Sequence, residues 1–395
     1  MSRSRRAVAL GRRLAVPAVL ALALALAACG DDDGGPAASS PAALAVPGAV
    51  DLAPVCPERV VIQTDWNPEM EHGALYQLLG DPYTVDADRK RVRGPLVAGG
   101  EPTGVEVEIR SGGPAIGYQD VGAQMAQDRA IHLGYVSTDE AVKLWDTIRT
   151  RAVVAPLEVN PQVIMWDPAT YPDVRTIADL GEAGVRILVR ETVSYLGYLV
   201  RSGQVDAGQL DGSYQGDPAA FVAAGGRIAQ QGFASAEPYV LEHEIPEWGR
   251  PVAFQLVHDA GWETYPQPLV VAADRLEELR PCLHRLVPVV QQAVVDLVAD
   301  PSRVERIVLE LVERYDTGWV YSPGVADHAM RTMVELGVIG NGPDATVGNF
   351  DEGRLARFLP EALAVFREED PSLPELAPED IATNEFIDPS IGLPG

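Results

Sequence analysis

One stretch, residues 60–80, constrains the fold of this chain most, because it predicts a strand, a polar loop and a helix in immediate succession. Its first three residues form a β-branched apolar run typical of a buried strand, and the sequence turns polar at Thr64. Pro68 suits the first turn of a helix over residues 69–79, and Gly80 is a natural helix end. This order is typical of α/β folds, in which ligands bind at the carboxyl ends of strands.

Four side chains around this loop are candidates for ligand binding. Asp65 and Trp66 lie in the loop itself, and His72 and Tyr76 stand four residues apart, so they share one helix face. Taken singly, the two aromatic residues are also compatible with the edge of a core, and His72 with the surface of a helix. Because all of them gather at one strand end, we favour a binding site.

The spacing of six residues in this stretch resembles the opening signature of a known family. The matching residues are Asp65, Trp66, Pro68, His72, Tyr76 and Gly80. The family comprises solute-binding proteins that bind pyrimidine precursors of thiamine and is related to nitrate- and sulfonate-binding receptors. The resemblance covers roughly residues 56–367. It implies a type II periplasmic-binding-protein fold, with two α/β lobes, a two-crossover hinge and a ligand cleft. It also implies an ABC permease and ATPase as partners, and we expect a monomer.

The N-terminus is similar to the leader of a bacterial lipoprotein. Arginines up to Arg13 precede an apolar run over residues 14–28, which is too short to span a bilayer comfortably. We expect cleavage of residues 1–28 and lipidation of Cys29; a plain secretory signal that contains a cysteine is the alternative. Residues 29–55 predict a flexible tether. The protein is therefore expected at the extracytoplasmic face of the bacterial cell membrane, attached through its lipid anchor only.

The charge balance limits the partners. The chain has 57 acidic and 31 basic residues, a formal net charge of −26, which argues against nucleic acid because phosphate binding needs a basic surface. The same excess weakly disfavours a highly charged anionic ligand. The six histidines show no close metal-ligand spacing, so we expect no metal site.

Two cysteines remain outside the leader, Cys56 before the first strand and Cys282 at the start of a late helix. A disulfide is permitted outside the cytosol, and two buried free thiols are the alternative. We favour the disulfide, which would tie the start of the folded body to a C-terminal element.

Further along the chain, strand-like and helix-like patterns alternate, which predicts α/β layers. We expect one lobe to comprise residues 56–158 and 252–367, the other to comprise residues 159–251, and residues 368–395 to form a C-terminal tail. Residues 81–103 hold turn residues, short extended pieces and a basic cluster, and we interpret them as an insertion, such as a surface hairpin.

Polar and aromatic residues recur at later strand ends. Ser111 and Gly112 separate a strand from a helix, where small residues let backbone N–H groups approach a ligand oxygen, although an ordinary turn explains them equally well. Ser137 or Thr138 either caps the next helix or faces the ligand. The candidates from the second lobe are Glu191, Tyr195, Asp211, Tyr214 and Glu237.

The resemblance implies a small heteroaromatic ligand such as a pyrimidine precursor of thiamine, and the candidate residues favour a neutral or amino-bearing ring. Aromatic side chains stack on such a ring, and carboxylates accept hydrogen bonds from its amino group. Arg110 and Arg190 are the counter-evidence, because either could clamp a small anion of the sulfonate or nitrate type.

Two other functions, catalysis and surface adhesion or sensing, would use the same fold. A branch of the same family synthesises the pyrimidine from a lysine-bound pyridoxal phosphate, but the only lysines are Lys90 and Lys143, and neither lies in the candidate loops. We therefore expect neither catalysis nor a cofactor. A surface adhesion or sensor module would share the fold and differ in its partner.

Overall fold

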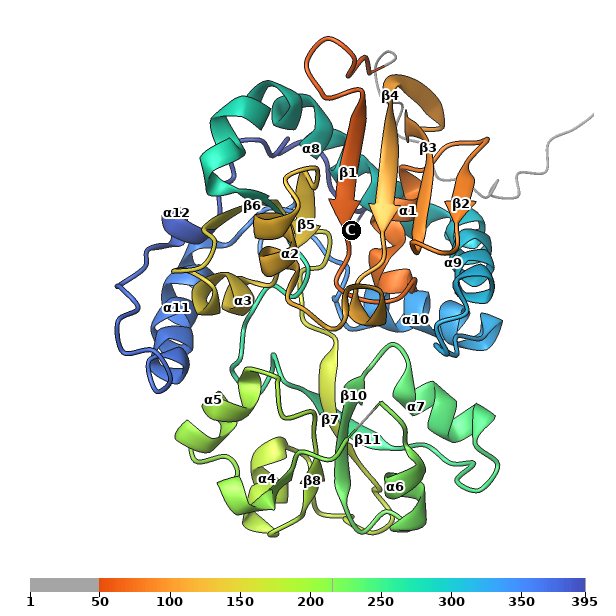
Figure 1. Ribbon diagram of the computed structural model, residues 1–395. Helices are drawn as coiled ribbons and strands as arrows, with labels where there is room; N and C mark the ends of the chain where they lie inside the picture. Colours follow the sequence, from red (N-terminus) through yellow and green to blue (C-terminus); the bar gives the residue numbers. More distant parts are fainter. Residues whose placement is uncertain (1–49, 215, 395) are drawn as a thin grey trace, which may run out of the picture. The chain divides into compact units, whose positions relative to one another are not determined.

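The computed structural model describes residues 50–214 and 216–394 (Figure 1). The expected leader and the expected lipidation site Cys29 lie outside the described residues. The described part of the chain contains two β-sheets and the helices that pack on them, which confirms the predicted α/β class. We call the first sheet with its helices lobe 1 and the second sheet with its helices lobe 2.

The sheet of lobe 1 has seven strands in the order β2-β3-β4-β1-β5-β12-β6. The strands are β1 (Arg59–Gln63), β2 (Thr84–Asp86), β3 (Arg91–Ala98), β4 (Glu101–Arg110), β5 (Leu133–Tyr135), β6 (Thr150–Val154) and β12 (Leu269–Ala272). β1 lies between β4 and β5 and runs parallel to both. Val60 and Ile62 enter one hydrophobic cluster and Val61 enters another, so β1 is buried on both faces, as its continuous apolar run predicts.

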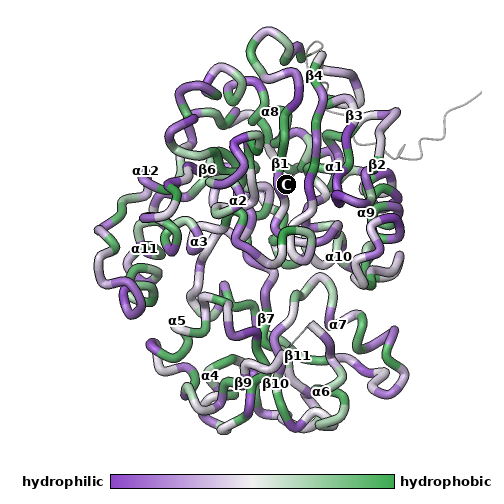
Figure 2. The backbone as a smooth tube through the Cα atoms, in the orientation of Figure 1, coloured by the Kyte–Doolittle hydropathy of each residue, from purple (hydrophilic) through white to green (hydrophobic). Residues whose placement is uncertain are grey.

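Helices cover both faces of this sheet. The cluster that contains Val60 and Ile62 also holds residues from α1 (Gly73–Gln77), α8 (Leu276–Ala299), α9 (Ser302–Tyr315) and α10 (Pro323–Glu335). The cluster that contains Val61 holds residues from α2 (Val121–Gln127), α3 (Thr138–Lys143), α11 (Glu352–Phe366) and α12 (Pro378–Ile381). Figure 2 shows β1 and much of α8 in hydrophobic colours, in keeping with these buried positions.

One helical segment, Ala273–Ala299, is long and apolar enough to cross a membrane by length and composition alone. However, 56% of its most apolar window is buried inside the body, where α8 packs in the same cluster as β1. Its apolar character therefore fits a core helix of lobe 1.

The sheet of lobe 2 has five strands in the order β11-β7-β10-β8-β9. They are β7 (Gln162–Trp166), β8 (Ile187–Leu188), β9 (Leu210–Asp211), β10 (Ala229–Phe233) and β11 (Ala253–Leu256). The helices are α4 (Ile177–Glu182), α5 (Tyr195–Arg201), α6 (Ala219–Ala223) and α7 (Glu237–Tyr239), and α7 continues into a π-helical turn, Val240–Glu244.

Two crossovers connect the lobes, residues 155–161 between β6 and β7 and residues 257–268 between β11 and β12. We expected the return to lobe 1 at residue 252. Instead β11 pairs with β7 and belongs to the sheet of lobe 2, so the chain returns only after it.

Arg354 of α11 holds the two crossovers together. Its side chain is almost fully buried and donates to the carbonyl oxygen of Glu158 (2.8 Å) in the first crossover and to those of Glu263 (2.7 Å) and Thr264 (2.8 Å) in the second. It also pairs with the Glu158 carboxylate at 3.1 Å, and its guanidinium lies 3.8 Å from the ring centroid of Tyr265. A single buried cation therefore fixes the spacing of both connections.

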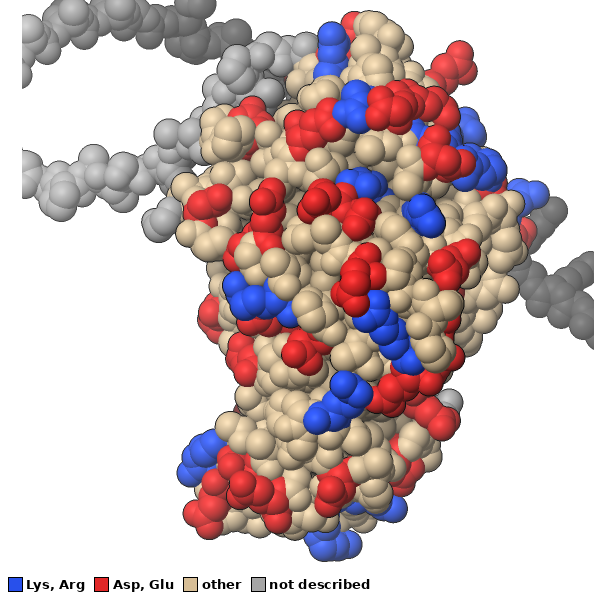
Figure 3. All heavy atoms as spheres, turned by 90° about the vertical axis from the view of Figure 1, so that its left-hand side faces the viewer, with Lys and Arg blue, Asp and Glu red and all other residues tan. Residues whose placement is uncertain are grey.

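The expected insertion, residues 81–103, extends the sheet of lobe 1 at its edge. It supplies β2, β3 and the beginning of β4, with Gly99 and Gly100 at positive φ in the turn between β3 and β4. Two of its basic side chains face acidic residues of β4: Arg91 lies 3.5 Å from Glu108, and Arg93 lies 4.0 Å from Glu106. Figure 3 shows another face of the molecule, on which acidic side chains are spread over both lobes with basic ones interspersed.

Both ends of the described chain pack on lobe 1. Leu52, which we expected in the tether, is fully buried, and its N–H donates to Thr103 at 2.8 Å, so any tether ends before it. In the C-terminal tail, Ala382 bridges Ala152 of β6, and Phe386 is buried in the same cluster as β1. The tail thus wraps the surface of lobe 1.

Cys56 and Cys282 are joined by a disulfide that links the segment before β1 to α8 across 226 residues of sequence. Because such a cross-link restricts the unfolded chain, we expect the Cys56→Ala/Cys282→Ala variant to unfold with about 2–4 kcal/mol less stability. Urea unfolding with and without reductant measures this. Reductant should destabilise the parent protein and leave the double variant unchanged; equal sensitivity of the two would contradict the assignment.

Candidate ligand-binding site

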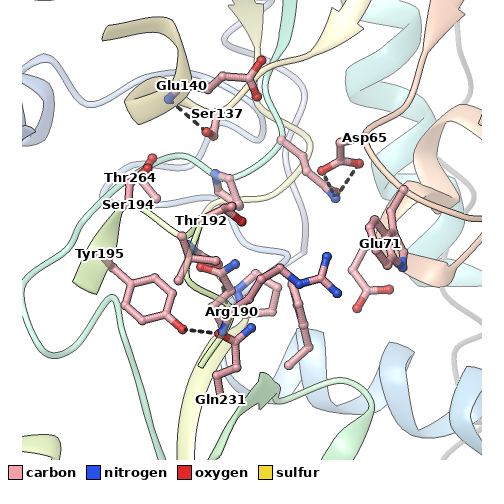
Figure 4. A pocket seen from close by; sticks show the side chains of 18 of the residues that line it. Asp65, Glu71, Ser137, Glu140, Arg190, Thr192, Ser194, Tyr195, Gln231 and Thr264 are labelled. Atoms are coloured by element: carbon pink, nitrogen blue, oxygen red, sulfur yellow. Dashed lines mark hydrogen bonds between the residues drawn. The ribbon is translucent and has the colours of Figure 1, made fainter. Parts of the chain in front are cut away.

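A cavity of about 320 Å³ has walls from lobe 1, from lobe 2 and from both crossovers. Of the residues that we expected to bind a ligand, six line it: Asp65, Trp66, Ser137, Tyr195, Tyr214 and Glu237. The others do not: His72, Tyr76, Ser111, Gly112, Thr138, Glu191 and Asp211. Figure 4 shows Asp65 and Glu71 on one side of the cavity, with the Arg190 guanidinium pointing toward them.

Hydrogen bonds from two neighbouring side chains hold Asp65 in place. It follows β1 and accepts hydrogen bonds from His72 Nε2 at 2.8 Å and from Gln267 Nε2 at 3.0 and 3.2 Å. His72 is fully buried, because the expected helix begins as a 3-10 turn, Met70–His72, that turns the imidazole toward Asp65. His72 is therefore a positioning residue for the carboxylate and does not reach the cavity.

Trp66 is surrounded by aromatic rings and one cation. Its ring lies 5.8 Å from that of Tyr118 and 6.1 Å, edge to face, from that of Trp319. From lobe 2, the guanidinium of Arg190 lies 5.1 Å from the Trp66 ring centroid, within the range of a cation–π interaction. The indole thus forms one face of the cavity and contacts both lobes.

Gly112 and Gly113 support this loop and do not present N–H groups to a ligand. Their N–H groups donate to the carbonyl oxygens of Trp66 (3.0 Å) and Asp65 (2.9 Å). A Cβ atom on Gly112 would lie 2.3 Å from the Thr64 carbonyl oxygen, so glycine is required by close approach. Of the two interpretations of Ser111 and Gly112, the structure fits the ordinary turn, because the N–H donors of Gly112 and Gly113 are already used.

Tyr76 and Thr138 are buried behind the cavity wall. Burial raises the pKa of Tyr76, with the Glu69 and Asp65 carboxylates adding to the shift. The Thr138 hydroxyl bonds Thr264 at 2.9 Å and accepts from the N–H of Tyr265, so it joins α3 to the second crossover. Ser137 caps α3 by accepting from the Glu140 N–H at 3.2 Å, and it also lines the cavity.

In lobe 2, two tyrosines and one carboxylate form the opposite wall. The Tyr195 hydroxyl donates to Gln231 at 3.3 Å, and the Tyr214 hydroxyl donates to Glu237 at 3.3 Å. Two candidates from lobe 2 lie outside the cavity wall. Glu191 is exposed, whereas Asp211 lies 3.4 Å from Arg186 and accepts a hydrogen bond from the N–H of Ser213.

Several wall residues were missed by sequence reasoning. They include Glu69, Glu71, Asp139, Glu140, Gln231, Gln267, Trp319 and Tyr321. Glu69 and Glu71 stand beside the matched motif, and we read them as part of a regular helix. Gln267 and Trp319 come from segments that carry no strand-end pattern. Of the two arginines we weighed, Arg190 lines the cavity, whereas Arg110 is paired with Glu108 (2.7 Å) and Asp128 (2.8 Å).

The wall carries far more carboxylates than cations. The acidic residues are Asp65, Glu69, Glu71, Asp120, Asp139, Glu140 and Glu237, and the basic ones are Lys143 and Arg190. Burial raises the pKa of Glu140 to about 8. Within the described ranges, no group of three or more His, Cys, Asp or Glu residues is arranged to hold a metal ion. The cavity therefore presents acceptors and aromatic faces in excess of cationic groups.

Comparisons with solved structures identify the fold. A protein from Bordetella bronchiseptica RB50 aligns with a TM-score of 0.52 at 16% identity, over 84% of this chain and 96% of that one. The periplasmic aliphatic sulphonate binding protein SsuA from Escherichia coli aligns with a TM-score of 0.51 at 14% identity, over 86% and 95% of the two chains. This chain has the periplasmic-binding-protein fold. The architecture implied by the resemblance is thereby confirmed.

A third solved structure, the zinc-bound ligand-binding component of an ABC-type import system from Staphylococcus aureus, aligns with a TM-score of 0.50 at 12% identity, over 84% of this chain and all of that one. No model of a known protein family matches the sequence, and no curated protein matches it either. At such low identities the likeness extends to the fold, and the ligand has to be argued from the cavity.

The packing of Gly113 under Trp66 can be tested with a matched pair. Gly113 and Gly117 both have positive φ, 55° and 65°, but a Cβ atom at Gly113 would lie 2.7 Å from the Trp66 ring, whereas one at Gly117 has nothing within 4 Å. Both alanine variants should lose about 1–2 kcal/mol from backbone strain. Only Gly113→Ala should also change the near-UV circular dichroism of the tryptophans; identical spectra for the two variants would contradict the packing.

Proposed function

We propose that this chain is the extracytoplasmic ligand-binding protein of an ABC importer, anchored through Cys29 and partnered by a permease and an ATPase. The fold supports this, and so do the functions in the names of two structural neighbours, one a periplasmic sulphonate-binding protein and the other a component of an ABC-type import system. In this proposal the two lobes close on the ligand, and the closed form engages the permease. The proposed function includes no catalytic step.

For the ligand, we propose a small heteroaromatic compound that bears an amino group, such as a pyrimidine precursor of thiamine. The observation that carries this is the composition of the wall, in which aromatic side chains and carboxylates occur together and outnumber the cationic side chains. Trp66 supplies a ring face, and Tyr195 and Tyr214 lie in the opposite wall. A cavity of about 320 Å³ is at the small end of ligand sites, which suits a single substituted ring.

A small organic anion is the second candidate, and Arg190 is the observation that favours it. Its guanidinium lines the cavity, and no carboxylate of residues 50–214 and 216–394 lies within ion-pair distance of it. A guanidinium in that state can hold a sulfonate through two parallel hydrogen bonds. The carboxylates of the same wall disfavour this candidate wherever they are ionised, because a negative charge repels an anion.

A thermal-shift panel tests the proposed ligand class. The probes are 4-amino-5-hydroxymethyl-2-methylpyrimidine, thiamine, taurine, an alkylsulfonate and nitrate. A ligand at a hundred times its dissociation constant stabilises the protein by about 2.7 kcal/mol, which raises the melting temperature measurably. We expect the pyrimidine to give the largest shift. A shift confined to the sulfonate or nitrate would replace the proposal with the anion receptor.

Trp66 provides the matched variants for that panel. Trp66→Ala removes the ring face and should weaken binding of the stabilising probe at least tenfold, since a stacked ring and its buried area contribute more than about 1.4 kcal/mol. Trp66→Phe keeps an aromatic face and should lose less. Calorimetry measures both affinities, and equal affinities for the parent and the alanine variant would remove Trp66 from the site.

Arg190 separates the two candidates directly. Arg190→Gln should abolish binding of a sulfonate, because the cation of the wall that has no carboxylate partner among the described residues would be lost, and should change binding of the aminopyrimidine less than threefold. The affinities are measured by calorimetry for both probes. A loss of pyrimidine binding on this substitution would show that the guanidinium contacts the ring ligand and would contradict the proposed arrangement.

A further inference from the structure

Three glutamates converge in the cavity from both lobes. Glu69 and Glu71 precede α1 in lobe 1, and Glu237 begins α7 in lobe 2. Glu71 accepts a hydrogen bond from the hydroxyl of Ser235, which also lies in lobe 2, so the acidic side chains bridge the cleft. We call Glu69, Glu71 and Glu237 the acidic cluster.

The acidic cluster lacks neighbouring cations. Glu69 lies 3.7 Å from His72, whose imidazole already donates to Asp65, and no Lys or Arg of the described residues lies within 4.0 Å of any of the three glutamates. The other charged or titratable groups near the cluster are Asp65, Tyr76, Arg190, Tyr195, Tyr214 and Tyr321. Of these, only Arg190 is basic, and it lies against Trp66.

Two acceptor atoms in this wall are buried without a hydrogen-bond partner in the part of the chain that the structure describes. They are Oε2 of Glu71 and Oε1 of Gln267. A buried acceptor that is left unsatisfied costs about 1–3 kcal/mol, so a ligand that donates to it gains affinity. Both residues line the cavity, and a ligand with N–H donors would satisfy both atoms.

The protonation of the cluster follows from its surroundings. Burial, followed by the charges of Glu71, Asp65 and Glu237, raises the pKa of Glu69 well above its ordinary value. Burial also raises the pKa of Glu71 and of Glu237, against the opposing effect of their own hydrogen bonds. The empty cluster therefore retains protons at higher pH than separate glutamates would.

We propose that the cavity is selective for an organic cation, a ring that carries a protonated amino or amidino group, which enters the acidic cluster and expels protons from it. This inference rests on the proposed function and names the charge of the ligand. A positive charge next to the glutamates stabilises their ionised form, so protons leave as the ligand binds. The affinity should consequently rise with pH until the empty cluster is itself ionised.

A pair of probes that differ in charge tests the proposal. 4-Amino-5-aminomethyl-2-methylpyrimidine carries a protonated amine at neutral pH, and 4-amino-5-hydroxymethyl-2-methylpyrimidine has a hydroxyl in its place. Calorimetry at pH 6 and pH 8, in buffers of different ionisation enthalpy, gives the affinities and the number of protons released. We expect the aminomethyl probe to bind at least tenfold more tightly, to release protons and to gain affinity at pH 8.

The outcomes separate this inference from the function on which it rests. If the hydroxymethyl probe binds as tightly and neither probe releases protons, the cation inference is overturned while the pyrimidine receptor stands. If neither pyrimidine binds and an alkylsulfonate does, both are overturned. Because these measurements use the unmodified protein, they do not depend on any variant being able to fold.

Two variants test whether the acidic cluster causes the charge preference and the proton release. Glu71→Gln keeps the shape of the side chain and removes its charge, so it should reduce the preference for the aminomethyl probe at least tenfold and lower the number of protons released. Glu182→Gln, on the exposed end of α4, is the matched control and should leave both quantities unchanged. An unchanged preference and unchanged proton release in Glu71→Gln would exclude the cluster as the cation site.

Discussion

The arrangement of the two lobes depends on one buried cation. Arg354 donates to carbonyl oxygens in both crossovers and pairs with Glu158, and its helix, α11, packs against α3 in lobe 1 and α5 in lobe 2. A buried guanidinium is stable only when its donors are satisfied, so any relative movement of the crossovers at this point would leave donors unpaired. Arg354 therefore restrains relative movement of the two crossovers where it contacts them.

Within this frame, the site is set by the close approach of two loops. The loop after β1 and the loop after β4 touch at Gly112 and Gly113, whose N–H groups donate to the carbonyl oxygens of Trp66 and Asp65. His72 and Gln267 then orient the Asp65 carboxylate. Within the motif around Trp66, Asp65 and Trp66 line the cavity, and His72 supports the Asp65 carboxylate.

The sequence was informative wherever a local pattern decides the outcome. Alternating strand and helix patterns and the apolar run of β1 predict the α/β class, and strand-end positions point to Trp66, Tyr195 and Tyr214 in the cavity wall. The sequence did not predict the features that depend on tertiary packing. A regular helix after Pro68 would leave His72 on a surface, but the 3-10 turn buries it, and Gln267 and Trp319 reach the wall from segments without any local signal.

The acidic cluster has a consequence for the fold as well as for the ligand. Because burial raises the pKa of Glu69, Glu71 and Glu237, the folded state favours their protonated forms, so their contribution to stability is full at low pH and is lost as pH rises through the raised values. A loss of folding stability of this kind is tolerated at binding sites, where function and stability compete. A cationic ligand of the kind that we propose would reverse this loss of stability by stabilising the ionised glutamates, so the charge that makes the cleft less stable would become the source of its affinity.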